Sequence, residues 1–262
     1  PPPIFENSEY KGTVKLKDKV AIITGCVSGI GRAVAVAFAK EGADLCIVYY
    51  DEHDDANFTK KLVEAQGRKC ILISGDVKQS EFCKFSVEET IAKLGKLDVL
   101  VNNAGVQFPQ TNLEDISDEQ FATTFHTNIF AMFYMAKHAR PYLKDGSCII
   151  NTTSVTAYIG QQNLMDYSST KGAIVSFTRA LARSLADKHI RVNAVAPGPI
   201  WTPLIPASFD DQEIETFGSS VPMKRPAQPV ELAPTYVYLA SDDSSYVTGQ
   251  ILHVDGGQSM QS

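Results

Sequence analysis

Short runs of aliphatic and β-branched residues alternate with helix-length segments from residue 19 onward, and this alternation constrains the fold more than any other feature. Strands joined by helix-length connections form right-handed βαβ units, which produce a parallel sheet. We therefore expect one doubly wound α/β domain, with a seven-stranded parallel sheet and helices on both faces. The expected strands are 19–24, 44–49, 69–74, 98–101, 147–151, 191–195 and 250–254, and the clearest helical patterns are 30–41, 54–66, 80–94, 118–143 and 166–188.

The composition restricts the possible functions. A formal charge of −6 leaves no basic surface of the kind that nucleic-acid binding needs. No apolar run approaches the roughly 18 residues of a membrane span. The five cysteines and five histidines show no metal-ligand or disulfide spacing, which favours reduced, buried thiols in a cytoplasmic protein. Without a repeat or a second-domain boundary, we expect an N-terminal arm at 1–18, outside the core, and one domain at 19–262.

A glycine-rich turn follows the first expected strand, in the order Thr24-Gly25-Cys26-Val27-Ser28-Gly29-Ile30-Gly31. Glycines let the backbone turn tightly and approach a phosphate, and the free N–H groups of the next helix favour its negative charge. Many such turns only connect a strand with a helix, but at the first βα junction of a doubly wound sheet the turn indicates a Rossmann-type dinucleotide site. Cys26 is either a thiol with a lowered pKa, able to act as a redox switch, or a tolerated small side chain.

Tyr167 and Lys171 are four residues apart, so they lie on one face of the fifth helical pattern. A phenol ionises near pH 10, and a neighbouring ammonium group lowers that pKa toward the working pH of an enzyme. A pair with this spacing is often no more than an exposed helical surface. The surrounding sequence favours a catalytic role for this pair, because polar or turn-forming segments follow several of the expected strands. These segments are Asn102-Asn103-Ala104-Gly105, Ser154 and Pro197-Gly198, and Asn128 lies inside the fourth helical pattern.

With TGxxxGIG at 24–31, Tyr-x-x-x-Lys at 167–171 and these strand ends, residues 19 to 257 resemble the short-chain dehydrogenase/reductase family. The likeness is greatest to its bacterial general stress protein and glucose-ribitol dehydrogenase branch. It implies an oxidoreductase that transfers hydride between a nicotinamide cofactor and the CH–OH group of an alcohol, or its carbonyl, without a metal. The implied catalytic residues are Asn128 (proton-relay water), Ser154 (hydrogen bond to the substrate oxygen), Tyr167 (general acid/base) and Lys171 (lowering of the tyrosine pKa and ribose binding).

The resemblance also implies a cofactor-binding set, which contains Gly25, Ser28, Gly29, Ile30, Gly31, Asp51, Asp76, Val77, Asn103, Ala104, Gly105, Tyr167, Lys171, Pro197, Gly198, Ile200 and Thr202. The segment after the second strand is acidic, and carboxylates repel the 2′-phosphate of NADP. We therefore expect NAD to be preferred, with Asp51 on the ribose. Two alternatives stay open: the acidic residues are only a solvated helix start, or Arg32 reaches a phosphate.

The substrate pocket is expected between residues 155–165 and a lid at about 201–222. Its mixture of apolar and amide side chains suits a sugar, a polyol or a small ketone. Since the family usually forms dimers or tetramers, we expect a homotetramer, with the apolar faces of 125–142 and 173–185 as candidate interfaces. A catalytically weak cofactor-binding protein with a stress or regulatory role remains the alternative.

Overall fold

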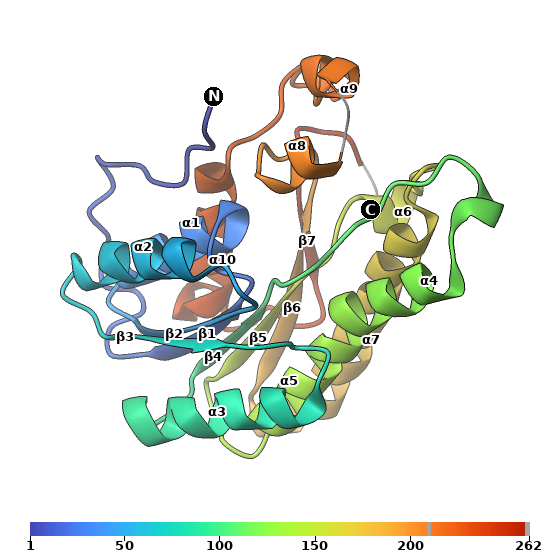
Figure 1. Ribbon diagram of the computed structural model, residues 1–262. Coiled ribbons are helices and arrows are strands. Elements are labelled where there is room, and N and C mark those ends of the chain that lie inside the picture. The colour runs from blue at the N-terminus through green and yellow to red at the C-terminus, as the bar shows by residue number, and fades with distance from the viewer. Residues whose placement is uncertain (209–210, 260–262) are drawn as a thin grey trace.

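The computed structural model describes residues 1–208 and 211–259, except for the side chains of 211–213. Its centre is a seven-stranded parallel sheet in the order β3-β2-β1-β4-β5-β6-β7 (Figure 1). The strands are β1 (Val20–Thr24), β2 (Asp44–Tyr49), β3 (Cys70–Ser74), β4 (Val99–Asn102), β5 (Cys148–Thr152), β6 (Arg191–Pro197) and β7 (Ile251–Val254). The expected doubly wound α/β domain is confirmed, and each strand lies within two residues of its predicted bounds.

Helices cover both faces of the sheet, which is why every residue of β1, β4, β5 and β6 is buried. One face is covered by α1 (Gly29–Lys40), α2 (His53–Glu64) and α10 (Pro229–Ala240). The other is covered by α3 (Ser80–Leu94), α5 (Ala131–Ala139) and α7 (Met165–Leu185) (Figure 1). Two apolar cores therefore hold the sheet rigid between them.

The strand order reverses at β1, which lies between β2 and β4. At such a switch point the loops from neighbouring strand ends separate and leave a crevice for a ligand. The loops after β1 and β4 are bonded to each other here: Asn103 Nδ2 donates to the carbonyl of Gly25 at 2.9 Å, and the Thr24 hydroxyl accepts the N–H of Asn103 at 3.0 Å. These bonds fix the geometry of the crevice floor.

The fourth helical segment differs from the continuous helix expected at 118–143. It is built from α4 (Asp118–Phe125), a π-helical turn (His126–Phe130) and α5, which ends at Ala139. A π turn inserts an extra residue and often marks a functional position. Here it contains Asn128, which is fully buried.

Several helices were not expected from the sequence. The largest is α10, which begins with Pro229 and a capping box between Gln228 and Glu231, a pattern that marks helix starts. The others are the short helices α6 (Thr156–Ile159), α8 (Leu204–Ser208) and α9 (Asp211–Thr216). Residues 209 and 210 of the expected lid lie outside the described residues.

The N-terminal segment 1–18 lies against α1 and α10. The backbone N–H groups of Thr13 and Lys15 donate to the buried carboxylate of Glu41, at 3.0 and 2.8 Å. Leu16 is fully buried within the core, in contrast to the expectation of an arm outside it. The segment is thus fastened to the domain. Among residues 1–208 and 211–259, no helix is long and apolar enough to cross a membrane.

Candidate active site

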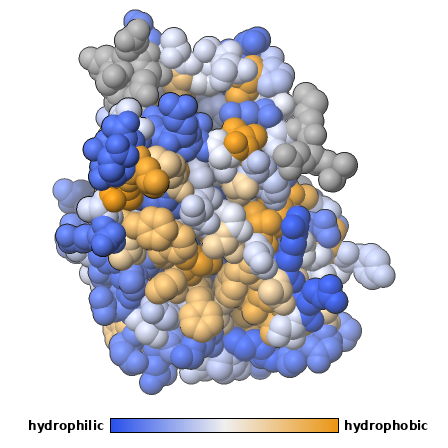
Figure 2. All heavy atoms as spheres, turned by 90° about the vertical axis from the view of Figure 1, so that its right-hand side faces the viewer, coloured by the Kyte–Doolittle hydropathy of each residue, from blue (hydrophilic) through white to orange (hydrophobic). Residues whose placement is uncertain are grey.

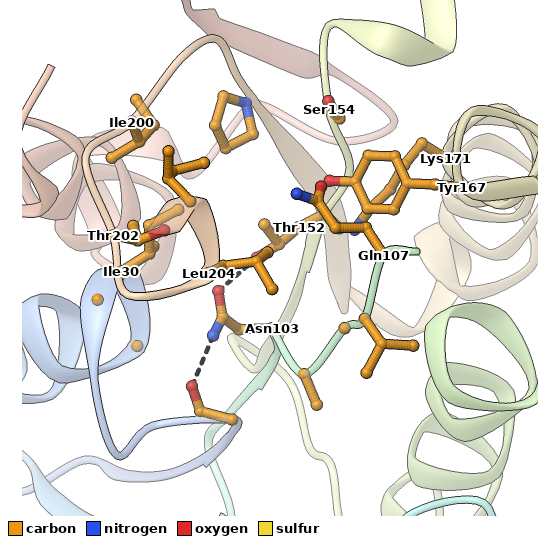
Figure 3. Close-up of a pocket in the computed structure, with 18 of the residues that line it drawn as sticks. Ile30, Asn103, Gln107, Thr152, Ser154, Tyr167, Lys171, Ile200, Thr202 and Leu204 are labelled. Carbon is orange, nitrogen blue, oxygen red and sulfur yellow. Dashed lines mark hydrogen bonds between the residues drawn. The ribbon is translucent and has the colours of Figure 1, made fainter. Parts of the chain in front are cut away.

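A cavity of about 870 Å³ opens at the carboxyl ends of the strands (Figure 3). It extends from the glycine turn after β1 to the side chains of Ser154, Tyr167 and Lys171. Nearly all of the predicted site residues line it: Gly25, Ser28, Gly29, Ile30, Gly31, Asp76, Val77, Asn103, Ala104, Gly105, Ser154, Tyr167, Lys171, Pro197, Gly198, Ile200 and Thr202. Asp51 and Asn128 are the two predicted residues that do not line it.

The glycine turn forms one end of the cavity. Gly25 has φ +63°, and a Cβ added there would lie 2.7 Å from the Cα of Ala104. A Cβ on Gly31 would lie 2.2 Å from the carbonyl oxygen of Gly25, so neither position accepts a larger residue. The Ser28 side chain makes no capping hydrogen bond to α1 within the described part of the chain. The first-turn N–H groups of α1 therefore remain available to a phosphate, and the turn fits a dinucleotide.

Tyr167 and Lys171 come from the first turns of α7, at the opposite end of the cavity. Lys171 Nζ lies 5.1 Å from the centre of the Tyr167 ring and donates a 3.1 Å hydrogen bond to the carbonyl of Thr152. Burial raises the pKa of Tyr167 to about 12, and a hydrogen bond with Ser154 partly opposes that rise. Burial also lowers the pKa of Lys171 to about 8. In the protein alone the pKa of Tyr167 is therefore raised, and the largest cause is desolvation of the phenol. The expected lowering of this pKa by Lys171 stays a prediction.

Asn128 lies behind the cavity wall. Its Oδ1 accepts the N–H of Val106 at 2.8 Å, and its Nδ2 donates to the carbonyl of Val106 at 2.9 Å and to the Thr170 hydroxyl at 3.1 Å. A Cβ on Gly105 would lie 3.4 Å from Asn128 Oδ1 and 3.7 Å from Lys171 Nζ, so both side chains flank the same loop. Asn128 thus fastens the loop after β4 to α7.

The end of the cavity beside β2 differs from the prediction. Asp51 is exposed and outside the lining, whereas Tyr50 and Glu52 line the cavity. Glu52 is the N-cap residue of α2, at the end of the turn after β2, and its side chain makes no capping hydrogen bond within the described part of the chain. Arg32 also lies outside the lining, because its guanidinium pairs with Asp55 at 2.6 Å and donates to the Thr59 hydroxyl at 3.0 Å. The structure therefore does not support Arg32 as a phosphate ligand.

Cys26 does not have the surroundings of a reactive thiol. It is fully buried, its Sγ donates to the carbonyl of Gly31 at 3.1 Å, and burial raises its pKa well above that of a free cysteine. The redox-switch alternative is contradicted, and Cys26 is a tolerated small side chain. Within residues 1–208 and 211–259, no three potential ligands cluster as a metal site would require.

Sequence reasoning missed two residues of this region. Gln107 lines the cavity two positions beyond Gly105. Asp166, directly before Tyr167, is a buried carboxylate bonded to α4. Neither has a spacing that predicts a role, although both neighbour recognised motifs along the chain.

A family model described as enoyl-(acyl carrier protein) reductase matches residues 25–259 of this chain. The chain is a short-chain dehydrogenase/reductase. The expected family is thereby confirmed, and with it the assignment as an oxidoreductase.

Curated short-chain dehydrogenases/reductases resemble this chain along almost its whole length. General stress protein 39 of Bacillus subtilis (strain 168) is 60% identical over 257 residues, which cover 98% of this chain and 90% of that protein. NADPH-dependent aldehyde reductase 1, chloroplastic, of Arabidopsis thaliana is 51% identical, with 97% and 91% covered. Glucose and ribitol dehydrogenase of Daucus carota is 49% identical, with 98% and 90% covered.

Solved structures of short-chain dehydrogenases/reductases share the fold. An enzyme from Burkholderia cenocepacia J2315 in complex with NADP has a TM-score of 0.88 at 29% identity, covering 93% of this chain and 99% of that one. A 3-ketoacyl-(acyl-carrier-protein) reductase from Brucella melitensis complexed with NADH has a TM-score of 0.85 at 34% identity, covering 94% and 100%. Family members of this shape therefore bind either nicotinamide cofactor.

Proposed function

We propose that this protein is an NAD(P)-dependent enzyme that interconverts an alcohol and its carbonyl. The observation that carries the proposal is that one continuous cavity joins the glycine turn at 25–31 to Ser154, Tyr167 and Lys171 at its other end. A dinucleotide bound along it would have its pyrophosphate at the turn and its nicotinamide beside Tyr167. The nicotinamide, when bound, supplies or accepts the hydride.

The side chains handle the proton. With its pKa raised to about 12, Tyr167 holds its proton at neutral pH and can donate it to a carbonyl oxygen during reduction. The Ser154 hydroxyl would donate a second hydrogen bond to the same oxygen and hold it in line. Lys171 would bind the ribose hydroxyls and lower the tyrosine pKa once the cofactor and substrate are in place. Asn128 would hold a relay water, which its position beside Gly105 and Lys171 supports.

The remaining lining residues would position the cofactor. Asp76 and Val77 would meet the adenine, residues 103–105 the adenosine ribose, and residues 197–202 the nicotinamide and its carboxamide. We propose a preference for NAD, with Glu52 rather than Asp51 near the ribose 2′-hydroxyl. Lys78 lines the cavity, and its Nζ is 3.5 Å from the carboxylate of Asp76, which reduces its attraction for a phosphate.

The substrate end combines apolar and amide side chains, including Val155, Leu164, Gln161 and Asn163. This lining suits a sugar, a polyol or a small ketone, and the name of the carrot relative points to the same class. Thr202, Leu204 and Phe217 from the lid segment border the cavity and would close over the substrate.

We also propose a cytoplasmic homotetramer. Phe121, Phe130 and Phe133 expose between 41% and 47% of their surface on α4, the π turn and α5, and Figure 2 shows apolar side chains gathered over this side of the molecule. Contiguous exposed aromatic surface is typical of protein interfaces. The cysteines, all buried and free, support a reducing compartment.

The test is a steady-state screen of aldehydes, ketones, sugars and polyols with both cofactors, in the wild type and in Tyr167→Phe. We expect turnover in the wild type and its loss in the variant. Cofactor binding, measured by quenching of Trp201, should be retained. A Phe variant with a tenth of wild-type activity would refute the role of Tyr167. Cofactor binding without turnover of any substrate would favour a stress or regulatory protein instead.

A further inference from the structure

One buried polar group at the substrate end has no part in the proposed chemistry: the side-chain amide of Gln107. Only 8% of this residue is exposed, although it lines the cavity. Its Nε2 is buried and has no hydrogen-bond partner among the described residues. Figure 3 shows the side chain directed into the cavity, toward the region that the Tyr167 phenol also faces.

A buried amide without a partner is unusual in a folded protein. The NH₂ group has two protons to donate, and nearly all buried donors find an acceptor. Two other described lining residues contain a buried unpartnered atom, the hydroxyl of Thr156 and the side-chain oxygen of Gln258, but both residues are more exposed than Gln107. The Nε2 of Gln107 therefore belongs to the most buried of these three residues, and an oxygen atom of a ligand would give it the acceptor that it lacks.

The loop holds Gln107 in place from both sides. The residue before it, Val106, is bonded through its N–H and its carbonyl to the side chain of Asn128, at 2.8 and 2.9 Å. The carbonyl of the residue after it, Phe108, accepts a 3.1 Å hydrogen bond from Gln120. With the backbone fixed on either side, the amide is positioned before any ligand arrives, as recognition groups generally are.

We propose that Gln107 is a substrate-recognition residue that donates a hydrogen bond to a hydroxyl oxygen on the carbon next to the reacting one. It would thereby select hydroxylated carbonyl compounds and polyols over their deoxy analogues. This inference rests on the proposed function, since Ser154 and Tyr167 are assigned to the reacting oxygen and leave the neighbouring oxygen to Gln107. A site built to bond a substrate hydroxyl rejects the analogue that lacks it, because the donor then stays buried without a partner.

The experiment compares kcat/KM for glyceraldehyde with that for propanal, which lacks the hydroxyl groups. In Gln107→Leu we expect the value for glyceraldehyde to fall at least about tenfold, and that for propanal to change by less than about threefold. Gln107→Met keeps the length of the side chain but removes the N–H donor, and should lose the same preference. Gln66→Leu, the same change at an exposed position beyond α2, is the matched control and should leave both values unaltered.

An unchanged ratio, or an equal loss for both carbonyls, would overturn the proposal. Thermal unfolding shows whether each variant is folded, and cofactor titration shows whether it binds the cofactor. Gln107→Met serves if the leucine variant does not fold. A wild type that binds cofactor but turns over no compound of the aldehyde, ketone, sugar and polyol screen would refute the proposed function alone. Gln107 is then tested by the rise in Tm that ribitol causes in the NADH-loaded protein. Loss of this rise in Gln107→Leu supports the proposal, whereas no rise in the wild type or equal rises overturn it.

Discussion

The backbone N–H of Tyr167 donates a 2.8 Å hydrogen bond to Oδ1 of Asp166, the residue directly before it. The other oxygen of Asp166 accepts the hydroxyl of Thr124 at 2.8 Å and the amide of Gln120 at 3.1 Å. Since Gln120 also bonds the carbonyl of Phe108, this buried carboxylate connects the start of α7 to α4 and to the loop after β4. The orientation of Tyr167 therefore depends on a residue that faces away from the cavity.

Replacement of Asp166 by alanine should reduce the free energy of unfolding by about 2 kcal/mol, because buried donors lose a charged acceptor. It should also lower kcat more than cofactor affinity, since the catalytic helix start loosens while the glycine turn is untouched. Urea denaturation and cofactor titration measure the two effects. Thr124→Val, which removes one of the bonds, should show a smaller loss of stability. Wild-type stability in Asp166→Ala would contradict this account.

Glu52→Ser should weaken the discrimination against NADPH. A carboxylate about 4 Å from a phosphate repels it by about 1 kcal/mol or more, so the ratio of the two cofactor dissociation constants should change by roughly threefold to tenfold. Asp51→Ser is the matched control, because Asp51 is exposed and outside the cavity lining. Paired NADH and NADPH titrations provide the measurement. If Asp51→Ser changes the ratio and Glu52→Ser does not, the assignment of the selecting carboxylate is reversed.

Lys171 should make stability depend on pH in the alkaline range. Burial lowers its pKa from 10.5 to about 8, so between these values the unfolded chain binds more protons than the folded protein. The contribution of Lys171 to the free energy of unfolding therefore increases as the pH rises from about 8 to about 10.5. Below pH 8 the full cost of burying the charge is present. In Lys171→Met the dependence disappears, so the variant's stability relative to the wild type should be greatest near pH 7 and decline by pH 10. Urea denaturation at both pH values tests this, and an equal difference at the two would contradict it.

Phe133→Glu should disrupt the proposed assembly. The ring is 47% exposed on α5, and a charge at the centre of an apolar interface opposes burial there. Analytical ultracentrifugation should show smaller species than in the wild type, with an unchanged far-UV spectrum. Phe85→Glu, at a 50% exposed phenylalanine on α3, is the control. A monomeric wild type would remove the basis of the homotetramer proposal.

The sheet was predictable because its strands are buried on both faces and therefore appear as continuous apolar runs, such as Val20–Thr24. The glycine turn was predictable for a related reason: only glycine tolerates the approach of Gly31 to the carbonyl of Gly25. In both cases the short-range pattern of residue types is compatible with few backbone conformations. The family resemblance implied a shared site for Ser154, Tyr167 and Lys171, and all three line one cavity.

The remaining features depend on tertiary contacts. A helical pattern does not distinguish an α-helix from one with a π turn, so the π turn that contains Asn128 was not foreseen. The choice between Asp51 and Glu52 depends on the path of a short turn rather than on charge. The pKa of Tyr167 depends on how deeply the phenol is buried and on its hydrogen bond with Ser154, which spacing along the chain does not reveal. Gln107 was not foreseen either, because a buried donor without a partner can be recognised only in the folded structure.

The five buried thiols can be used to measure local unfolding in different parts of the domain. Burial raises the pKa of each: to about 12 for Cys46, Cys70 and Cys83, to about 11 for Cys148, and well above the value of a free cysteine for Cys26. An alkylating reagent needs an accessible thiolate, and the closed fold offers it none among these five. Because these cysteines are distributed over β2, β3, β5, α3 and the turn after β1, the rate at which each is modified would report how often that part of the domain opens.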